Sequence, residues 1–432
     1  MIQTVTCLTF PLALQEAYRC LYCYDPPCMQ ACPVHINIPR FIKAITTGDF
    51  KSAYYLIRKS NPFPNTCALV CPVEKLCEGN CVLGTGAGKP VSIAKLQQFV
   101  VEKYKYPWEI NVTAPKTYKV GIIGAGPAGL AASERLLEAG IRVSVFDAKV
   151  EGGMMKLTIP AFRLPVNVVE EEIKELKTLG VSINSGVYIG EDIEKLLDSF
   201  DALLITVGLS GSRKLGIEGE EAKGVFVAEE FLARIKKGER LQLGDTVVVV
   251  GGGNTAMDSA CVSKELGVRR VTVIYRRTWN EMPAWERERI EAIKAGVEFI
   301  FLASPKKFIL DRKGKLKEIL CQEYTLGEND SSGRRRPEPL EGKEFCISAT
   351  TCVLALGQVL EFKPYFGDLY VNIERGVIKV DEQFMTSIPG VFAAGDAVNG
   401  GRTVVEAIAE GQKAGDFIIK YLESKKGGAS GE

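Results

Sequence analysis

Two glycine-rich turns, each set between an apolar strand and a helix, constrain the fold of this 432-residue chain most strongly. The first turn, 124–129, follows the apolar run 119–123 and precedes a predicted helix over 127–139 and a strand over 142–147. The second turn, 251–256, follows the run 246–250 and precedes a helix over 254–266 and a strand over 271–275. Each is a strand–helix–strand unit. We therefore expect an α/β fold with two Rossmann-like dinucleotide-binding domains that form an internal duplication.

The first turn has the residues that a bound dinucleotide requires. A first glycine permits the tight turn, a second lets the backbone approach a pyrophosphate, and a third lets helix and strand pack closely. The helix N-terminus adds free N–H groups and a partial positive charge. Asp147, at the end of the next strand, suits a ribose diol and would repel a 2′-phosphate. The turn thus predicts an FAD site, against the alternative of a glycine turn without a ligand. Its predicted contacts are Gly124, Gly126, Pro127, Ala128, Gly129 and Asp147.

The C-terminal region offers a second part of that FAD site. A short apolar strand over 391–394 ends in Gly395 and Asp396, and Asp396 is suited to hold ribityl hydroxyls. Thr403 and Glu406 then have capping-box spacing at the start of a helix. This cap is either structural only, or it presents the helix N-terminus to the flavin ring or a phosphate.

The second turn has a different charge pattern. Ala256 replaces the third glycine, which the dinucleotide fingerprint allows. Its second strand ends in Arg276 and Arg277, where the first unit has an acid. A basic pair suits a 2′-phosphate, so we predict NADPH rather than NADH as the ligand. The alternative is that one arginine is only a solvated surface charge.

Glycine-closed apolar runs suggest where the domains begin and end. The runs 201–207 and 351–356 end in Gly208 and Gly357, one on each side of the second unit. We expect a discontinuous FAD-binding domain, 113–208 with 358–432, interrupted by an NAD(P)H-binding domain, 209–357. A helical, cysteine-rich domain, 1–112, precedes them, with helices over 38–46 and 50–58 and a linker over 106–116. The polar stretch 327–342 is expected to be an exposed hairpin loop, and 427–432 a flexible tail.

Eight of the thirteen cysteines lie between positions 20 and 81. Cys20, Cys23, Cys28 and Cys32 approach the ferredoxin spacing, including a proline after the fourth, although the middle gap has four residues where the ferredoxin run has two. A second group contains Cys67, Cys71, Cys77 and Cys81. Eight thiolates would satisfy two four-iron clusters. Zinc and, less readily, disulfides are the alternatives.

The composition limits the classes of partner that the chain is expected to bind. Lys and Arg number 54 and Asp and Glu 53, which leaves a net charge of +1 and argues against nucleic acid or an anionic membrane surface. No run approaches the roughly 20 apolar residues of a membrane helix, and the N-terminus lacks the features of a signal peptide. We expect a soluble, cytoplasmic protein. The single histidine, His35, is not assigned as a ligand.

The motifs together resemble those of a known family. They comprise Cys20 and Cys23, the two Cys-Pro pairs at 32–33 and 71–72, Cys77 to Cys81, the first glycine turn, Gly152-Gly153, the segment 160–165 and 394–396. The chain resembles the small (beta) subunit of bacterial glutamate synthase over nearly its whole length. It is also similar to the N-terminal half of dihydropyrimidine dehydrogenase and to the large subunit of NADH-dependent ferredoxin:NADP oxidoreductase.

The resemblance implies how the ligands divide. One 4Fe–4S cluster would be held by Cys20, Cys23, Cys28 and Cys81. The other would be held by Cys32, Cys71, Cys77 and Gln97, which leaves Cys67 spare, unlike the count of eight thiolates. The resemblance also adds FAD contacts at Gly153, Met154 and Arg163, beside Gly395, Asp396 and Thr403, which the C-terminal strand and cap themselves suggest. For NADPH it implies Gly252, Gly253, Asn254, Thr255, Ala256, Arg276, Arg277, Ala355, Leu356 and Gly357.

These parts predict an FAD- and iron–sulfur-dependent NAD(P)H oxidoreductase with no catalytic side chain assigned. Its electrons would pass between NADPH, FAD and two clusters, to or from a separate subunit of the glutamate synthase type or of another oxidoreductase complex. A stand-alone NAD(P)H:ferredoxin-type enzyme and a zinc-bound nucleotide sensor are the alternatives. A disulfide reductase would need paired cysteines beside the flavin, yet the nucleotide region has only isolated ones. Met1 is followed by Ile2, not Cys, so glutamate synthesis would require a large subunit.

Overall fold

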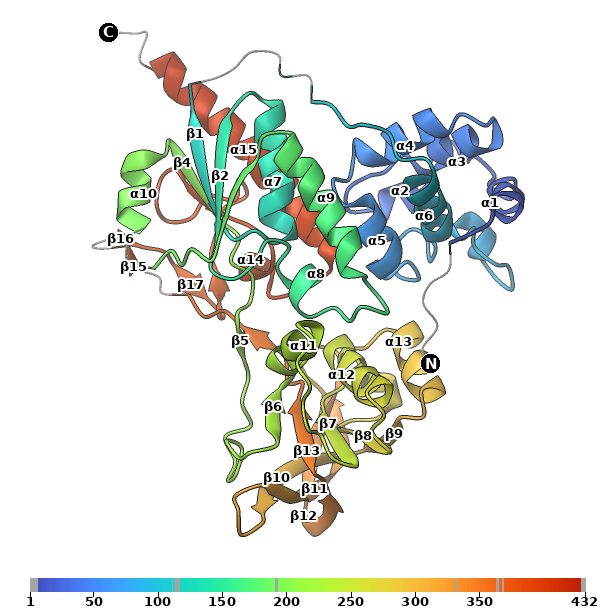
Figure 1. The fold of residues 1–432 in the computed structure, drawn as a ribbon, viewed down its shortest axis with the longest axis vertical. Helices are drawn as coiled ribbons and strands as arrows, with labels where there is room; N and C mark the ends of the chain where they lie inside the picture. The colour runs from blue at the N-terminus through green and yellow to red at the C-terminus, as the bar shows by residue number, and fades with distance from the viewer. Residues whose placement is uncertain are drawn as a thin grey trace. The chain divides into compact units, whose positions relative to one another are not determined.

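The computed structural model describes residues 7–110, 112, 117–190, 193–330, 332–362, 365–366 and 369–428 (Figure 1). The chain divides into two compact units, which are described separately below. The smaller unit contains Leu157–Phe162 and Gly211–Val359, and the larger contains Val5–Lys156, Arg163–Ser210 and Leu360–Glu432. The domain limits at 112, 208 and 357 stay predictions, since this division groups the cysteine-rich helices and the first dinucleotide fold in one unit.

The N-terminal part of the larger unit is helical, coloured blue in Figure 1. The helices expected over 38–46 and 50–58 are confirmed as α3 and α4, which begin at the capping side chains of Asn37 and Asp49. Prolines occupy the first turns of α1, α2, α3 and α5, where no N–H is needed. The elements are α1 Phe10–Ala17, α2 Pro27–Gln30, α3 Ile38–Thr46, α4 Phe50–Arg58, α5 Pro64–Val70, the 3-10 turn η1 Val82–Gly84 and α6 Ile93–Lys103.

The rest of the larger unit is a parallel five-stranded sheet in the order β19-β4-β1-β2-β3. The C-terminal strand β19 pairs with β4, so residues near 392 complete a sheet that begins near 119. Helices α7 and α15 lie side by side against it (Figure 1). The strands are β1 Lys119–Ile123, β2 Arg142–Asp147, β3 Ser182–Ser185, β4 Ala202–Ile205 and β19 Val391–Ala393, with small pairs β15 Tyr365–Phe366 and β16 Leu369–Tyr370, and β17 Ile373–Glu374 and β18 Val377–Ile378. The helices are α7 Pro127–Glu138, α8 Met154–Leu157, α9 Val166–Thr178, α10 Ile193–Ser199, α14 Asp396–Asn399 and α15 Val404–Gly428.

The smaller unit repeats the same plan with a second parallel sheet, β6-β13-β7-β8-β9, to which an antiparallel sheet β10-β11-β12 is added. The main sheet and its helices comprise β6 Val225–Val227, α11 Ala228–Lys236, β7 Thr246–Val250, α12 Asn254–Glu265, β8 Arg270–Tyr275, the 3-10 turn η2 Trp279–Glu281, α13 Glu286–Lys294, β9 Glu298–Phe301 and β13 Thr351–Leu354. The remaining strands are β10 Ala303–Leu310, β11 Leu316–Asn329, β12 Arg335–Ser348, and the pair β5 Gly211–Ser212 and β14 Gln358–Val359. The α/β architecture with two dinucleotide-binding folds is thus confirmed.

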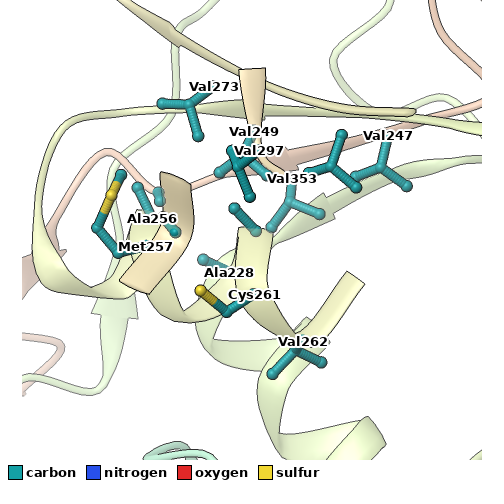
Figure 2. Packing of buried hydrophobic residues seen from close by; sticks show 14 of the residues in the cluster. Ala228, Val247, Val249, Ala256, Met257, Cys261, Val262, Val273, Val297 and Val353 are labelled. Carbon is teal, nitrogen blue, oxygen red and sulfur yellow. The ribbon is translucent and has the colours of Figure 1, made fainter. Parts of the chain in front are cut away.

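Small and β-branched side chains form the core of the smaller unit (Figure 2). Val247 and Val249 on β7, with Val353 on β13, face the α12 residues Ala256 and Cys261. Because Ala256 is fully buried here, the third fingerprint position has room for one methyl group. Close packing of α12 on the sheet holds its N-terminus at the end of β7, where the second glycine turn lies.

Two expectations need correction. The stretch 327–342 is not a loop throughout, because β11 extends to Asn329 and β12 begins at Arg335, so that only a short turn joins two long strands. The C-terminal helix α15 continues to Gly428, so the expected tail at 427 starts too early. Residues 429–432 lie outside the described residues. Among the described helices, none is both long and apolar enough to cross a membrane.

Candidate functional site

The first glycine turn has the backbone geometry that its sequence predicts. Gly124 has a φ of +109°, and a Cβ atom there would lie 2.3 Å from the Thr206 carbonyl oxygen. A Cβ atom at Gly129 would lie 2.1 Å from the Gly124 carbonyl oxygen, so neither position accepts a side chain. By contrast, a Cβ atom at Gly126 would have no neighbour within 4 Å. The open position is the one through which a pyrophosphate is expected to approach the backbone.

A second loop closes on this turn. The Gly152 N–H donates to the Ala125 carbonyl at 2.7 Å, and a Cβ atom at Gly153 would lie 3.1 Å from the Gly126 Cα. Asp147 accepts hydrogen bonds from the Ala125 N–H at 2.8 Å and the Lys149 N–H at 2.8 Å. The carboxylate therefore fixes the turn, and each of its oxygens keeps a lone pair for a ribose hydroxyl. Met154 begins α8 next to this loop, and Arg163 is half-buried further along the chain.

The C-terminal Gly-Asp pair lies at the same end of α7. A Cβ atom at Gly395 would lie 3.0 Å from the Ala128 Cβ, which places Gly395 against the first turn of that helix. Burial raises the pKa of Asp396 to about 6, while the Arg402 N–H donates to its Oδ1 at 3.1 Å. A largely buried carboxylate here is available to bind hydroxyl groups.

The Thr403 side chain has a capping role. Its hydroxyl accepts from the Glu406 N–H at 3.2 Å, and its own backbone N–H donates to Glu406 Oε2 at 3.0 Å, which is the reciprocal pair of a capping box. The structural alternative for this hydroxyl is therefore present in the structure. The backbone N–H and carbonyl of Thr403 are engaged within the helix start as well, and a role for Thr403 in FAD binding stays a prediction.

The second glycine turn repeats the geometry in the smaller unit. Gly251 has a φ of +142°, and a Cβ atom there would lie 2.2 Å from the Ala355 carbonyl oxygen. A Cβ atom at Gly252 would clash with the Tyr275 ring at 2.5 Å, whereas one at Gly253 would have no neighbour within 4 Å. No side chain caps the N-terminus of α12, which leaves its first amides for an anion. Asn254 is engaged locally, since its Oδ1 accepts from the Trp285 N–H at 2.9 Å.

The two predicted arginines lie in different surroundings. Arg276 is exposed at the end of β8, as a 2′-phosphate contact requires. Arg277 is 5% exposed, and it donates through Nη2 to Asp330 Oδ2 at 2.6 Å and through Nε to the Arg335 carbonyl at 2.7 Å. The turn between β11 and β12, with the first residue of β12, thus supplies both acceptors for this guanidinium. We therefore retain Arg276 alone as the proposed 2′-phosphate contact.

One group of thiols gathers around a pocket in the N-terminal helices. Cys20, Cys23, Cys28 and Cys81 all line it, together with apolar side chains of α3. Burial, with the nearby Cys81, Cys20 and Cys23 thiols, raises the pKa of Cys28 to about 11. These four thiols therefore lie within electrostatic reach of one another, although they are 61 positions apart at the extremes. The grouping fits the set that the resemblance implies for one cluster.

A second group contains the remaining thiols. A hydrogen bond to Cys67 and burial raise the pKa of Cys71, and the thiols of Cys77 and Cys32 add to the effect. Within the described residues, no three His, Cys, Asp or Glu side chains converge closely enough to chelate a single metal ion. Gln97 is 6% exposed and donates to the Pro64 carbonyl at 2.6 Å, with its carbonyl oxygen left as the potential ligand. Cys67 and Gln97 both remain open as the fourth ligand.

Backbone amides face one sulfur of the second group. N–H groups of Ile36, Val34 and His35 face the Cys32 sulfur and lower its pKa against the dominant effect of burial, which raises it. The His35 backbone therefore contacts the group, while its side chain is exposed. Asn61 Nδ2 and Asn65 Oδ1 are buried without a hydrogen-bond partner in the described chain. Buried polar atoms are nearly always satisfied, so these two atoms leave hydrogen bonds for a group outside the chain, such as an ordered water.

Sequence reasoning missed the polar contacts between the N-terminal helices and the FAD-type fold. Glu172 on α9 accepts from the Asn65 N–H at 2.7 Å and the Thr66 hydroxyl at 2.5 Å. Despite these donors, burial raises the pKa of Glu172 to about 7. The signal that could have found it is helical spacing, since Glu172 falls in register with the buried Val169, Ile173 and Leu176 of α9.

The Glu172 carboxyl gives the protein a pH-dependent stability. Its pKa is near 4.5 when unfolded and about 7 when folded, so the folded state binds one more proton between these values. Stability should fall as pH rises through this window, by up to ~1.4 kcal/mol per unit. Glu172→Gln, measured by anaerobic denaturant unfolding from pH 5 to 8, should flatten that dependence. The exposed control Glu170→Gln should retain it; equal slopes in all three proteins would contradict the assignment.

Comparisons with known proteins agree with this geometry. Residues 3–107 match the family model "dihydropyrimidine dehydrogenase domain II, 4Fe-4S cluster", and 118–411 match "pyridine nucleotide-disulphide oxidoreductase". The chain is 35% identical to the glutamate synthase [NADPH] small chain of Escherichia coli over 95% of this chain and 92% of that one. It is 38% identical to the NADP(+)-dependent formate dehydrogenase subunit beta of Moorella thermoacetica over 92% of this chain, but spans only 60% of that subunit.

A solved structure shows the same fold. Mycobacterium tuberculosis FprA in complex with NADPH superposes with a TM-score of 0.62 at 19% identity, over 73% of this chain and 86% of that one. Fold, glycine turns and thiol groups define an FAD- and iron–sulfur-dependent NAD(P)H oxidoreductase. The chain belongs to the pyridine nucleotide-disulphide oxidoreductases and, among them, to the family of the glutamate synthase small chain.

Proposed function

We propose that the chain is an NAD(P)H dehydrogenase and electron-transfer subunit that carries FAD and two 4Fe–4S clusters and exchanges electrons with a separate redox partner. The single observation behind this proposal is that both groups of four cysteines lie in the same compact unit as the first glycine turn. FAD, when bound, takes a hydride from the nicotinamide and gives up its electrons singly to iron–sulfur clusters.

The residues of this chain have binding and positioning roles in the proposal. Gly126 and Gly253 leave the backbone open to pyrophosphates, and the uncapped N-termini of α7 and α12 supply amides for them. Asp147 and Asp396 would hold ribose and ribityl hydroxyls. The remaining proposed FAD and NADPH contacts are those that the resemblance implies, without Arg277.

A separate partner is proposed from the relatives' names. They include a glutamate synthase small chain, a formate dehydrogenase subunit beta and, at 34% identity, the NADPH-Fe(3+) oxidoreductase subunit beta of Geobacter sulfurreducens. Their names give different reactions, but each name includes NADPH or NADP(+) and describes one chain or subunit of an enzyme. Affinity purification from the native cell under anaerobic conditions distinguishes a stoichiometric partner subunit from ferredoxin as a transient acceptor.

Elemental analysis tests the cofactor content. Protein prepared anaerobically should contain about one FAD and about eight irons with eight acid-labile sulfides per chain. Zinc in place of iron would support the nucleotide sensor and overturn the proposal. About four irons would reduce it to a single cluster, and the cysteine variants below would then identify which group holds it.

Arg276 should determine the preference for NADPH. A charge-assisted hydrogen bond contributes about 1.5–3 kcal/mol, so Arg276→Ala should weaken NADP⁺ binding by roughly 10- to 100-fold and leave NAD⁺ binding unchanged. Titration calorimetry with both nucleotides measures this. Arg270→Ala, at the exposed opposite end of β8, is the matched control and should change neither affinity. An equal loss for both nucleotides in the Arg276 variant would refute the assignment.

A further inference from the structure

A buried arginine joins the cysteine-bearing helices to the FAD-type fold. Arg58, the last residue of α4, is 1% exposed. Its Nη1 and Nη2 donate to the two carboxylate oxygens of Glu134 on α7 at 2.7 and 2.9 Å, and its Nε donates to Glu175 on α9 at 2.6 Å. The guanidinium lies 4.9 Å from the ring centroid of Trp108, whose Nε1 also donates to Glu134 at 3.1 Å. One side chain is thus fixed in position and in rotation by three partners.

The residues that follow Arg58 make further contacts with the same fold. Gln412 on α15 donates to the Ser60 carbonyl at 3.1 Å, and Glu172 accepts from the backbone and hydroxyl groups at 65–66, the first turn of α5. The segment 58–66 therefore contacts α7, α9 and α15. Directly after it, α5 carries Cys67 and leads to Cys71, while α7 begins at the first glycine turn.

The energetics favour a geometric role over a simple stabilising one. A buried ion pair contributes little net stability, because desolvation offsets its attraction, but it allows few alternative arrangements. A bidentate arginine pair adds directional constraint that a lysine cannot reproduce. A group that must only hold two surfaces together would need no such alignment, since apolar side chains serve equally well.

We propose that Arg58 is a positioning residue for electron transfer, which sets the distance between the flavin and the cluster of Cys32, Cys71 and Cys77. This inference rests on the proposed function. With FAD and the cluster bound, one electron would leave the NADPH-reduced flavin and enter the cluster, so the flavin would be oxidised and the cluster reduced by that electron. No bond forms or breaks at Arg58, whose guanidinium stays protonated throughout.

Rapid mixing with NADPH tests this in the whole chain, with Arg58→Lys compared to wild type. Flavin absorbance follows hydride transfer, and freeze-quench EPR follows cluster reduction. Electron-transfer rates fall steeply as the distance between donor and acceptor grows, so we expect cluster reduction to slow severalfold. Flavin reduction, iron content and cluster potentials should be unchanged. Arg135→Lys, in an exposed pair between α7 and Asp416 of α15, is the matched control and should behave as wild type.

The possible outcomes separate this inference from the function on which it rests. Wild-type protein without NADPH-reducible clusters would refute the proposed function. Functional wild type together with an Arg58→Lys variant that keeps its iron and reduces its clusters at the wild-type rate would overturn the role of Arg58. If the lysine variant loses iron, Glu175→Gln, which leaves the bidentate pair with Glu134 intact, should show the same selective slowing. Normal cluster reduction in that variant would also overturn the inference.

Discussion

Replacing Cys81 with alanine is expected to remove one cluster and leave the other. Its thiol lies in the group with Cys20, Cys23 and Cys28, so that cluster would keep three protein ligands. Iron should fall from about eight to about four per chain. Electron transfer to the physiological partner should be abolished, while NADPH-driven reduction of a dye that takes electrons from flavin should remain at the wild-type rate. Iron analysis and the two activity assays measure these effects.

Two further cysteine variants make this result specific. Cys346→Ala, on an exposed edge strand of the smaller unit, should change neither iron nor activity. Cys67→Ala separates the open alternatives for the second cluster, since it should keep about eight irons if Gln97 is the fourth ligand and about four if Cys67 is. Loss of both clusters in Cys81→Ala, with normal folding by circular dichroism, would contradict the division into two independent groups.

Replacing Gly411 with alanine is expected to impair FAD binding from a position far from the glycine turn in sequence. A Cβ atom there would lie 2.0 Å from the Ala128 carbonyl oxygen, a contact that backbone atoms cannot relieve without movement of α7 or α15. Overpacking of this kind costs about 1–3 kcal/mol. In the proposed FAD site, the N-terminus of α7 would face the pyrophosphate, so a shift between α7 and α15 would disturb that site. We expect lower thermal stability and a reduced flavin content after gel filtration.

The next turn of α15 supplies the control for Gly411. A Cβ atom at Gly415 would lie 3.3 Å from the Cβ and Cγ atoms of Arg135, a contact far less close than the 2.0 Å at Gly411. Because alanine favours a helix over glycine by up to about 1 kcal/mol, Gly415→Ala should leave stability unchanged or raise it. Full flavin content in both variants would show that the close approach of the two helices does not control the FAD site.

Local pattern was sufficient to predict the two dinucleotide folds. The glycine turns are recognisable because strand, turn and helix follow one another within about 30 residues. The structure has β1, β2 and β7 at the expected bounds, and α7 and α12 end one residue earlier than predicted. Gly124 closes its turn with a positive φ that glycine adopts readily. Asp147 accepts from Lys149 and Thr403 accepts from Glu406, so both of these contacts are local in sequence.

Long-range contacts could not be predicted in this way. Arg58 pairs with residues 76 and 117 positions away, and no periodicity links them. The sequence places Arg277 beside Arg276 as an equivalent base, yet the β11–β12 turn folds over it and buries it. The 2.0 Å approach at Gly411 depends on how α15 packs on α7, although a glycine inside a predicted helix was a signal that could have been used.

Anaerobic reduction with NADPH, followed by optical and EPR spectroscopy on the same samples, tests the central claim most directly. The account predicts that the flavin is reduced first and that signals of reduced iron–sulfur clusters then appear without any added mediator or partner. Flavin reduction with clusters that stay oxidised, although dithionite reduces them, would contradict it.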